Sequence, residues 1–184
     1  MLVATRKENV DTREATLKNS GLTPAIVDVE AYAIENAFGL IMDSLTKTES
    51  SGEPSLSLAK AREGLTALVA IGAALTTLYI LQQDRVIFSR EQRFGCDQLT
   101  VRIAETYGMS REQAEQAKRS GTVSEDYPTA ILEPFKQTLA EQISHGLQFF
   151  FSSDQYASGR YNIDTIVLSG GGATIMGLDR VVAD

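Results

Sequence analysis

Residues 65–81, LTALVAIGAALTTLYIL, form an apolar run without a charged side chain. A helix that crosses a membrane needs roughly 20 such residues, and this run is shorter and is interrupted by Gly72 and three threonines. It also lacks the one-sided cluster of Lys and Arg that orients an inserted helix. We therefore predict no transmembrane segment, but two buried strands, 65–72 and 75–81, around a turn at 72–74.

The composition argues against nucleic-acid binding, zinc binding and export. The chain has 17 basic and 24 acidic residues and a net charge of -7, so it lacks the positive surface of a general nucleic-acid binder. Its single cysteine, Cys96, cannot form an internal disulfide, and the sequence has no Cys/His cluster for zinc. The first residues lack the apolar core of a signal peptide. We expect a cytoplasmic protein and assign no catalytic and no metal-ligating residue.

Strand and helix patterns alternate along the chain, which predicts the α/β class. The polar segment 49–64 contains Gly52 and Pro54 and is expected to be a linker or loop. Before it we predict a strand (2–6), a helix (7–20), a strand (24–29) and a helix from Glu30. After it we predict a three-stranded meander that ends at 86–89. Two helices follow at 97–108 and 111–119, and the second has Ser110 as its cap and Gly121 as its stop. We then predict a long helix with an apolar stripe from Ile131 to Leu147, a strand at 165–168, a glycine loop and the start of a last helix.

The turn between the two apolar strands is the first motif that could carry chemistry. Gly72 and Ala73 shape this turn, and Thr76 and Thr77 follow it. Backbone N–H groups and hydroxyls in such a turn can bind a phosphate. An ordinary hairpin turn explains the same residues, and both interpretations stay open.

A second motif, IVLSGGGATIMG at 166–177, places Gly170, Gly171, Gly172 and Ala173 between a strand and a helix. Glycines let the backbone approach a ligand closely, and a helix N-terminus favours anions. The motif matches neither the dinucleotide pattern G-x-G-x-x-G nor a Walker A loop. A glycine-rich turn without a ligand is the alternative.

The third motif is a charged pair on one helix face. Glu115 and Lys118 are three residues apart, which brings a carboxylate and an ammonium together. The alternative is a solvated pair worth about 0.2–0.5 kcal/mol.

Taken in this order, the motifs resemble the nucleotide-binding fold of actin, the heat-shock chaperones and FtsA. Within that superfamily the chain is similar to the PilM family of type IV pilus assembly proteins, in the segments VDVEAYAIENAF, SREQRFGCDQLT, EPFKQTLAEQISHGLQFFF and LSGGGATIMGLDR. The resemblance covers nearly the whole chain. It implies a partial actin-like, ribonuclease H-like fold, with the end of a first domain at 1–48, the linker at 49–64 and a second domain at 65–184. It also implies a fragment that lacks the N-terminal part and the first phosphate motif.

The same resemblance implies an ATP site, with Mg²⁺ in the full-length protein. Glu30 stands where that superfamily keeps an acidic or amide side chain near the attacking water. The implied contacts are a second phosphate motif at Gly72, Ala73, Thr76 and Thr77, a ribose contact from Glu115 and Lys118, and an adenosine motif at Gly170, Gly171, Gly172 and Ala173.

Two positions depart from the family pattern. Ala70 stands where the family has the aspartate that opens the second phosphate motif, and Cys96 stands where it has the second glycine of a loop. An alanine cannot orient a water bound to Mg²⁺. We therefore expect nucleotide binding rather than hydrolysis, and weak or absent ATP binding by the chain as given.

The function that the resemblance implies is a cytoplasmic scaffold for type IV pilus assembly and twitching motility. Its partners would be the N-terminal cytoplasmic peptide of PilN and other inner-membrane and motor proteins of the pilus, which would hold it at the inner face of the inner membrane. Two alternatives stay open. One is an active ATPase of the same fold, and the other is an FtsA-like division protein with a C-terminal amphipathic membrane helix.

Overall fold

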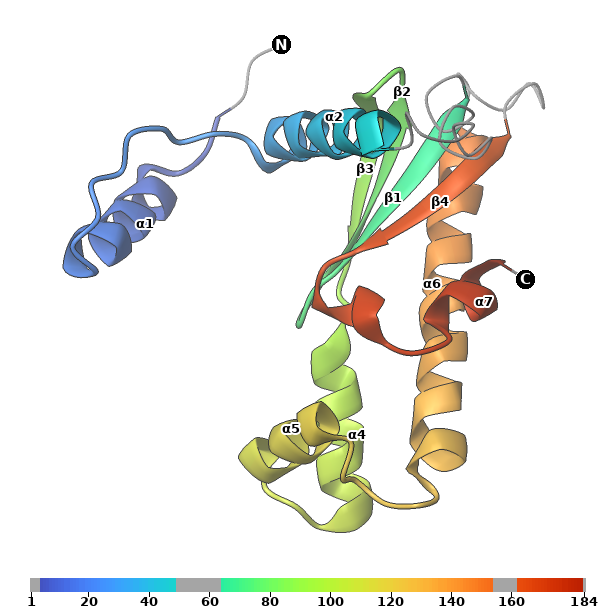
Figure 1. Cartoon of the computed structure of the whole chain (residues 1–184). Helices are drawn as coiled ribbons and strands as arrows, with labels where there is room; N and C mark the ends of the chain where they lie inside the picture. Colours follow the sequence, from blue (N-terminus) through green and yellow to red (C-terminus); the bar gives the residue numbers. More distant parts are fainter. Residues whose placement is uncertain (1–3, 49–63, 154–161, 184) are drawn as a thin grey trace.

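A mixed four-stranded sheet forms the centre of the computed structural model, which describes residues 4–48, 64–153 and 162–183. Strands β1, β2 and β3 form an antiparallel meander, and β4 lies parallel to β1 at the other edge (Figure 1). The order in the sheet is β3-β2-β1-β4. The predicted α/β class and the meander are confirmed. The strands are β1 (Leu65–Ile71), β2 (Thr76–Gln82), β3 (Arg85–Gln92) and β4 (Ile163–Ser169).

The apolar run 65–81 folds as the predicted hairpin. All of β1 except Ala70 is buried, and all of β2 except Gln82 is buried. The antiparallel register pairs Leu68 with Tyr79. Strands covered on both faces have nearly continuous apolar sequences, which explains why this run has the composition of a short membrane span. None of the helices in the described segments combines the length and the apolar character that a membrane span requires.

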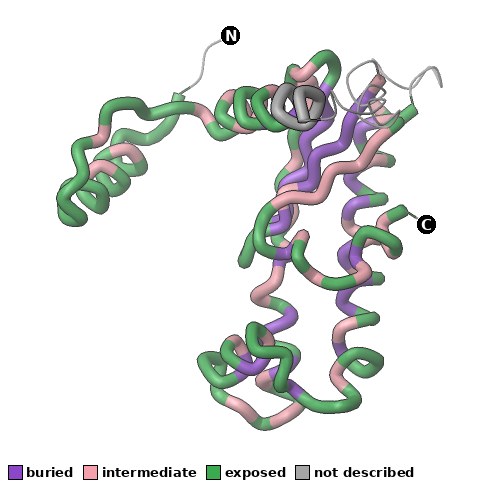
Figure 2. Tube along the Cα trace, viewed as in Figure 1, coloured by how far each residue is buried: buried purple, intermediate pink, exposed green. Residues whose placement is uncertain are grey.

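Helices cover both faces of the sheet. On one face the strands share a large core with α4 (Cys96–Tyr107), α5 (Arg111–Ser120) and α6 (Glu133–Ser152). On the other face α2 (Glu30–Thr48) places Phe38 and Met42 against Leu68, Tyr79 and Leu81. Figure 2 shows buried positions along the strands and along α6. A short last helix, α7 (Leu178–Ala183), follows the glycine loop and contacts α6.

Local sequence signals set the ends of α4, α5 and α6. Ser110 and Gln113 form a reciprocal capping box, because each side chain accepts a hydrogen bond from the backbone N–H of the other. Gly108 and Gly121 end α4 and α5 with left-handed φ angles of 63° and 69°. The predicted cap at Ser110 and stop at Gly121 are confirmed. A π-helical turn, Pro128–Leu132, precedes α6, so the long helix begins at Glu133.

The N-terminal part differs from the prediction in its strands. The helices are present as α1 (Lys7–Asn19) and α2, but residues 24–29 form no strand, and Ile26 is 86% exposed. The predicted strand 2–6 is also not seen at residues 4–6, and residues 1–3 lie outside the described segments. A strand needs a neighbour for its backbone hydrogen bonds, and no described strand pairs with 24–29. In Figure 1, α1 lies away from the sheet.

The division of the chain at 49–64 stays a prediction, because residues 49–63 lie outside the described segments. The structure adds that α2, from the predicted first domain, docks on the sheet of the second. Its Glu30 accepts a hydrogen bond from the Tyr79 hydroxyl at 2.9 Å, and its Glu35 accepts one from the Val86 N–H at 2.7 Å.

Candidate functional site

A cleft of about 940 Å³ opens between the β1–β2 turn, α4, α5 and the loop that follows β4. Polar and charged groups from α4 and α5 form one side, and the glycine loop with Ile175 and Met176 forms another. The fold thus brings together segments that are distant in the sequence. Six of the predicted site residues line this cleft: Gly72, Ala73, Glu115, Lys118, Gly171 and Gly172.

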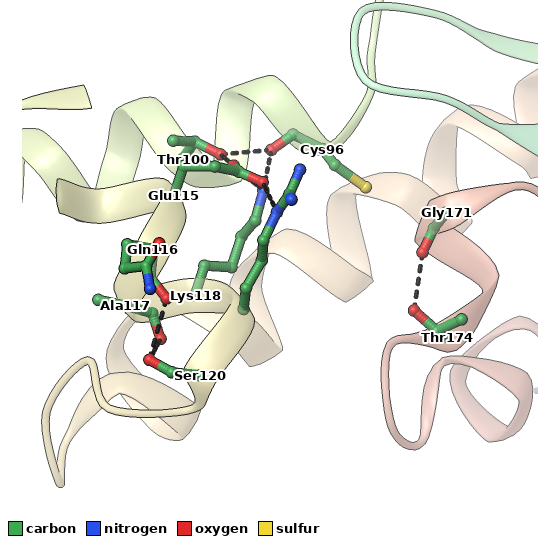
Figure 3. A network of polar contacts seen from close by, with 10 residues as sticks. Cys96, Thr100, Glu115, Gln116, Ala117, Lys118, Ser120, Gly171 and Thr174 are labelled. Atoms are coloured by element: carbon green, nitrogen blue, oxygen red, sulfur yellow. Dashed lines mark hydrogen bonds and ion pairs between the residues drawn. The ribbon is translucent and has the colours of Figure 1, made fainter. Parts of the chain in front are cut away.

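The polar side of the cleft is a network of short contacts around Glu115 (Figure 3). The Lys118 ammonium lies 2.6 Å from Glu115 Oε2 and donates to the Thr100 hydroxyl at 2.7 Å. That hydroxyl donates to Glu115 Oε2 at 2.7 Å, and Arg119 Nε donates to Glu115 Oε1 at 2.8 Å. The carboxylate of Glu115 therefore has a cation on each oxygen and is fixed between α4 and α5.

These contacts control the ionisation of Glu115. Its pKa falls to about 2, chiefly because Lys118 donates a hydrogen bond to the ionised carboxylate, against an opposing effect of burial. Thr100 and Arg119 lower the pKa further through their own hydrogen bonds. The group is a carboxylate at neutral pH and can accept hydrogen bonds from hydroxyl groups of a ligand.

The β1–β2 turn is fixed against the start of α4. The carbonyls of Gly72 and Ala73 accept hydrogen bonds from the N–H groups of Cys96 and Asp97, at 3.0 and 2.8 Å. A Cβ on Gly95 would overlap the Ala73 carbonyl oxygen, so this close approach requires a glycine. The Gly72 N–H donates to the Leu75 carbonyl at 2.9 Å. The Gly72 N–H is therefore already hydrogen-bonded within the turn, although Gly72 and Ala73 both line the cleft.

Two predicted phosphate contacts lie away from the cleft lining. Thr76 and Thr77 are buried in β2, at 2% and 8% exposure. The Thr76 hydroxyl donates to the Phe94 carbonyl at 2.7 Å. Both threonine side chains are thus packed inside the sheet. Their contact with a phosphate stays a prediction.

The three glycines of the loop after β4 differ in the space around them. Gly170 has a φ of +81°, and a Cβ there would lie 2.6 Å from the Ile71 carbonyl oxygen. A Cβ on Gly172 would overlap the Ile71 side chain, whereas one on Gly171 would meet nothing within 4 Å. Packing therefore explains the glycines at 170 and 172, while Gly171 leaves room in the cleft for a ligand. Gly170 and Ala173 are not part of the cleft lining.

The departures from the family pattern have distinct surroundings. Ala70 lies in β1 between Thr77 and Ser169 and packs toward the α2 face of the sheet. Cys96 is half-buried and lines the cleft, and its Sγ lies 3.0 Å from the place of a Gly172 Cβ. Burial raises the pKa of its thiol, although Lys118 opposes this shift. Glu30 bonds to Tyr79 and does not line the cleft.

The residues of the cleft do not fit a resident Mg²⁺ ion. Its two carboxylates, Asp97 and Glu115, are each held by cations, Asp97 by Arg111 at 2.8 Å. In the part of the chain that the structure describes, no group of three or more His, Cys, Asp or Glu side chains could hold a metal. Hard divalent cations need several oxygen ligands. The lining suits an anionic organic ligand better, since it combines Lys118, Arg119 and Arg111 with an open glycine.

Sequence reasoning missed several residues of the cleft. Thr100 and Arg119 complete the network around Glu115, and Tyr127 adds an aromatic side chain to the lining. Arg119 could have been found, because it follows Glu115 by four residues on the same helix face. Thr100 and Tyr127 have no such local signal, since Thr100 meets Glu115 through the packing of α4 on α5 and Tyr127 reaches the cleft through the tertiary fold.

Comparison with known proteins gives both a family and a fold. The family model described as "Type IV pilus assembly protein PilM" matches residues 1–184. The solved structure of a PilM-PilN type IV pilus biogenesis complex is similar, at 21% identity and a TM-score of 0.68. The alignment covers 97% of this chain and 46% of the matched chain in that structure. The structure of MreB 5 of Spiroplasma citri bound to AMPPNP is also similar, at 15% identity and a TM-score of 0.57, and the alignment covers 96% of this chain and 57% of the MreB 5 chain.

A third similar structure is Ta0583, an archaeal actin homolog, in complex with ADP. The alignment covers 87% of this chain and 49% of the Ta0583 chain, at 16% identity and a TM-score of 0.57. These similarities establish an actin-like fold. The chain spans about half the length of the structures it matches.

Proposed function

Because this chain belongs to the PilM family of type IV pilus assembly proteins, we propose that it supplies one side of an ATP site in a cytoplasmic actin-like scaffold. The scaffold would recruit inner-membrane pilus proteins and so be held at the inner face of that membrane. The observation that carries the proposal is the cleft that unites Glu115 and Lys118 on α5 with Gly171 after β4. These residues belong to the ribose and adenosine motifs that the family resemblance implies.

The chemistry of the cleft supports a nucleotide as its ligand. Glu115 and Lys118 offer an acceptor and a donor for ribose hydroxyls. Arg119, with its side chain 77% exposed, can lie flat on an aromatic base, and Lys118 and Arg111 favour phosphate. The open space at Gly171 lets a flat ligand approach the backbone. When bound, ATP would supply the negative charge and the planar base that these groups can recognise.

The single cysteine provides a direct test of the proposed site. Cys96 lines the cleft, so bound ATP should shield its thiol from an alkylating reagent. With a dissociation constant on the order of 1 mM, about 5 mM ATP should slow alkylation roughly sixfold. Mass spectrometry of the intact protein measures the rate without ambiguity, since Cys96 is the one cysteine.

A matched variant gives this test its control. Glu115→Gln removes the charge that fixes Lys118 and Arg119, and it should abolish most of the protection by ATP. Equal alkylation rates with and without ATP in the unmodified protein would contradict an ATP site in this cleft.

A scaffold role rather than an ATPase role is supported by Ala70. A methyl group at this position has no oxygen to orient a water or a metal-bound water. We expect no ATP turnover by the unmodified protein in a phosphate-release assay. Comparison with Ala70→Asp shows whether a carboxylate at this position introduces turnover. Turnover by the unmodified protein would refute the scaffold proposal in favour of the ATPase alternative.

The proposed partner is the short N-terminal cytoplasmic peptide of PilN. The family supports this proposal, and one of the similar solved structures is described as a PilM-PilN type IV pilus biogenesis complex. The family match also favours pilus assembly over the FtsA-like alternative. A fluorescently labelled peptide of the cognate PilN N-terminus should bind in an anisotropy titration, and a scrambled peptide should not. Equal signals from both peptides would contradict the proposed partner.

A further inference from the structure

Lys136 is the one charged residue that is buried among the side chains that the structure describes, with 5% of its surface exposed. It lies in the first turn of α6, three residues after Glu133. A buried ammonium costs several kcal/mol unless partners compensate for its lost hydration. The place of Lys136 therefore calls for a role that an apolar residue could not fill.

The partners of Lys136 join α6 to the end of the glycine loop. Its ammonium lies 2.5 Å from Glu133 Oε1 and donates to the Met176 carbonyl at 3.4 Å. A Cβ on Gly177, which has a φ of +75°, would also lie 3.4 Å from the same ammonium. The tip of the lysine thus lies directly against the backbone turn at 176–177.

This turn forms part of the cleft wall. Ile175 and Met176 line the cleft, while Leu178, at the start of α7, is fully buried in the core. Met176 is 88% exposed, so its own side chain does little to hold the turn. Lys136 is not part of the cleft lining. Any effect of Lys136 on a ligand must therefore act through the position of this turn.

We propose that Lys136 is a positioning residue for the nucleotide cleft, which holds the Ile175–Met176 wall in place through the Met176 carbonyl. The negative charge of Glu133 compensates for the buried ammonium and keeps it directed at this carbonyl. This inference rests on the proposed function of the cleft as an ATP site. It adds a residue that the sequence motifs do not include.

The test compares Lys136→Met, which keeps the length and the apolar stem but removes the ammonium, with Lys136→Arg, which keeps the charge. Titration with ATP, followed by NMR shifts of the cleft amides, measures affinity. Lys136→Met should raise the dissociation constant about fivefold, and Lys136→Arg should largely restore it. Lys18→Met, which removes an exposed lysine paired with Glu14, is the matched control and should bind like the unmodified chain.

Hydrogen exchange separates a positioning role from general destabilisation. In Lys136→Met, the amides of residues 175–178 should exchange faster, while those of β1 and β2 should keep their protection. Glu133→Gln, which leaves the lysine in place without its compensating charge, should shift exchange in the same direction and keeps the test valid if Lys136→Met fails to fold. Unchanged ATP affinity in a folded Lys136→Met protein would overturn the proposal.

The same experiment distinguishes failure of this inference from failure of the proposed function. If the unmodified chain shows no ATP-dependent shifts at millimolar ATP, the proposed function is wrong and the role of Lys136 toward ATP falls with it. Faster exchange confined to 175–178 would then still support Lys136 as the residue that holds this turn. Unchanged exchange at 175–178 would overturn that role as well.

Discussion

Lys118 on α5 donates a hydrogen bond to the hydroxyl of Thr100 on α4 at 2.7 Å, and the same hydroxyl donates to Glu115 at 2.7 Å. One buried hydroxyl thus links the cation and the carboxylate that were predicted as a ribose contact. Contacts between the two helices hold these groups in one arrangement. Such preorganisation reduces the entropy that binding would otherwise lose.

Replacement of Thr100 by valine should lower the free energy of unfolding by about 1–2 kcal/mol, because its partly buried partners Glu115 and Lys118 each lose a hydrogen bond. Thr100 is 1% exposed, so water cannot replace the lost group. Denaturant unfolding measures the change. Thr138→Val is the control, because that hydroxyl is exposed and bonds within α6. Equal effects of the two substitutions would contradict a structural role for the Thr100 hydroxyl.

The network around Glu115 predicts a specific response to acid. The pKa of Glu115 is about 2 in the folded protein, against about 4.3 for an ordinary glutamate. Because the folded pKa is the lower one, the stabilisation is complete above pH 4.3 and is lost as the pH falls toward 2. NMR titration of the side-chain carboxyl should give a midpoint near 2, and Lys118→Met should raise it. A midpoint at the ordinary value in the unmodified protein would refute the network.

Two neighbouring glycines should respond differently to the same substitution. Gly172→Ala places a methyl group against Ile71 and should lower the melting temperature. Gly171→Ala meets no atom within 4 Å and should fold normally, yet it should weaken ATP binding because the methyl group lies in the cleft. Thermal melting and ATP titration of both variants check this pair. Normal ATP binding by Gly171→Ala would argue against a ligand at this loop.

The docking of α2 predicts a response to base. Burial, together with the hydrogen bond to Glu30 and the negative charge of Glu30, raises the pKa of Tyr79 to about 12. Since the folded pKa exceeds the ordinary value of about 10, the stabilisation is present below pH 10 and is lost as the pH rises toward 12. Glu30→Gln should lower the spectrophotometric midpoint of this tyrosine. An unchanged midpoint would show that Glu30 does not act on Tyr79 in solution.

Local patterns predicted much of the second part of the chain. The hairpin of 65–81, the cap at Ser110 and the pair of Glu115 and Lys118 each depend on residues close in sequence, and each is present. The strand predicted at 24–29 is absent because strand formation also needs a partner, which periodicity alone does not reveal.

The arrangement of the site was harder to predict than its motifs. Gly171 reaches the cleft because β4 pairs with β1 in parallel across a long crossover. Thr76 and Thr77 are the first two residues of a strand buried on both faces, so their side chains are enclosed by the fold. No sequence motif marks Lys136, since the Met176 carbonyl to which it donates a hydrogen bond lies in a distant segment of the chain.

The central claim is that the cleft between α5 and the glycine loop binds ATP. Titration of the isotope-labelled chain with ATP, observed by backbone amide NMR, tests it most directly. We predict shift changes at residues 72–73, 96–100, 115–119 and 171–176, with a dissociation constant on the order of 1 mM and loss of these changes in Glu115→Gln. Absence of shift changes in these segments at millimolar ATP, or equal changes in Glu115→Gln, would contradict the claim.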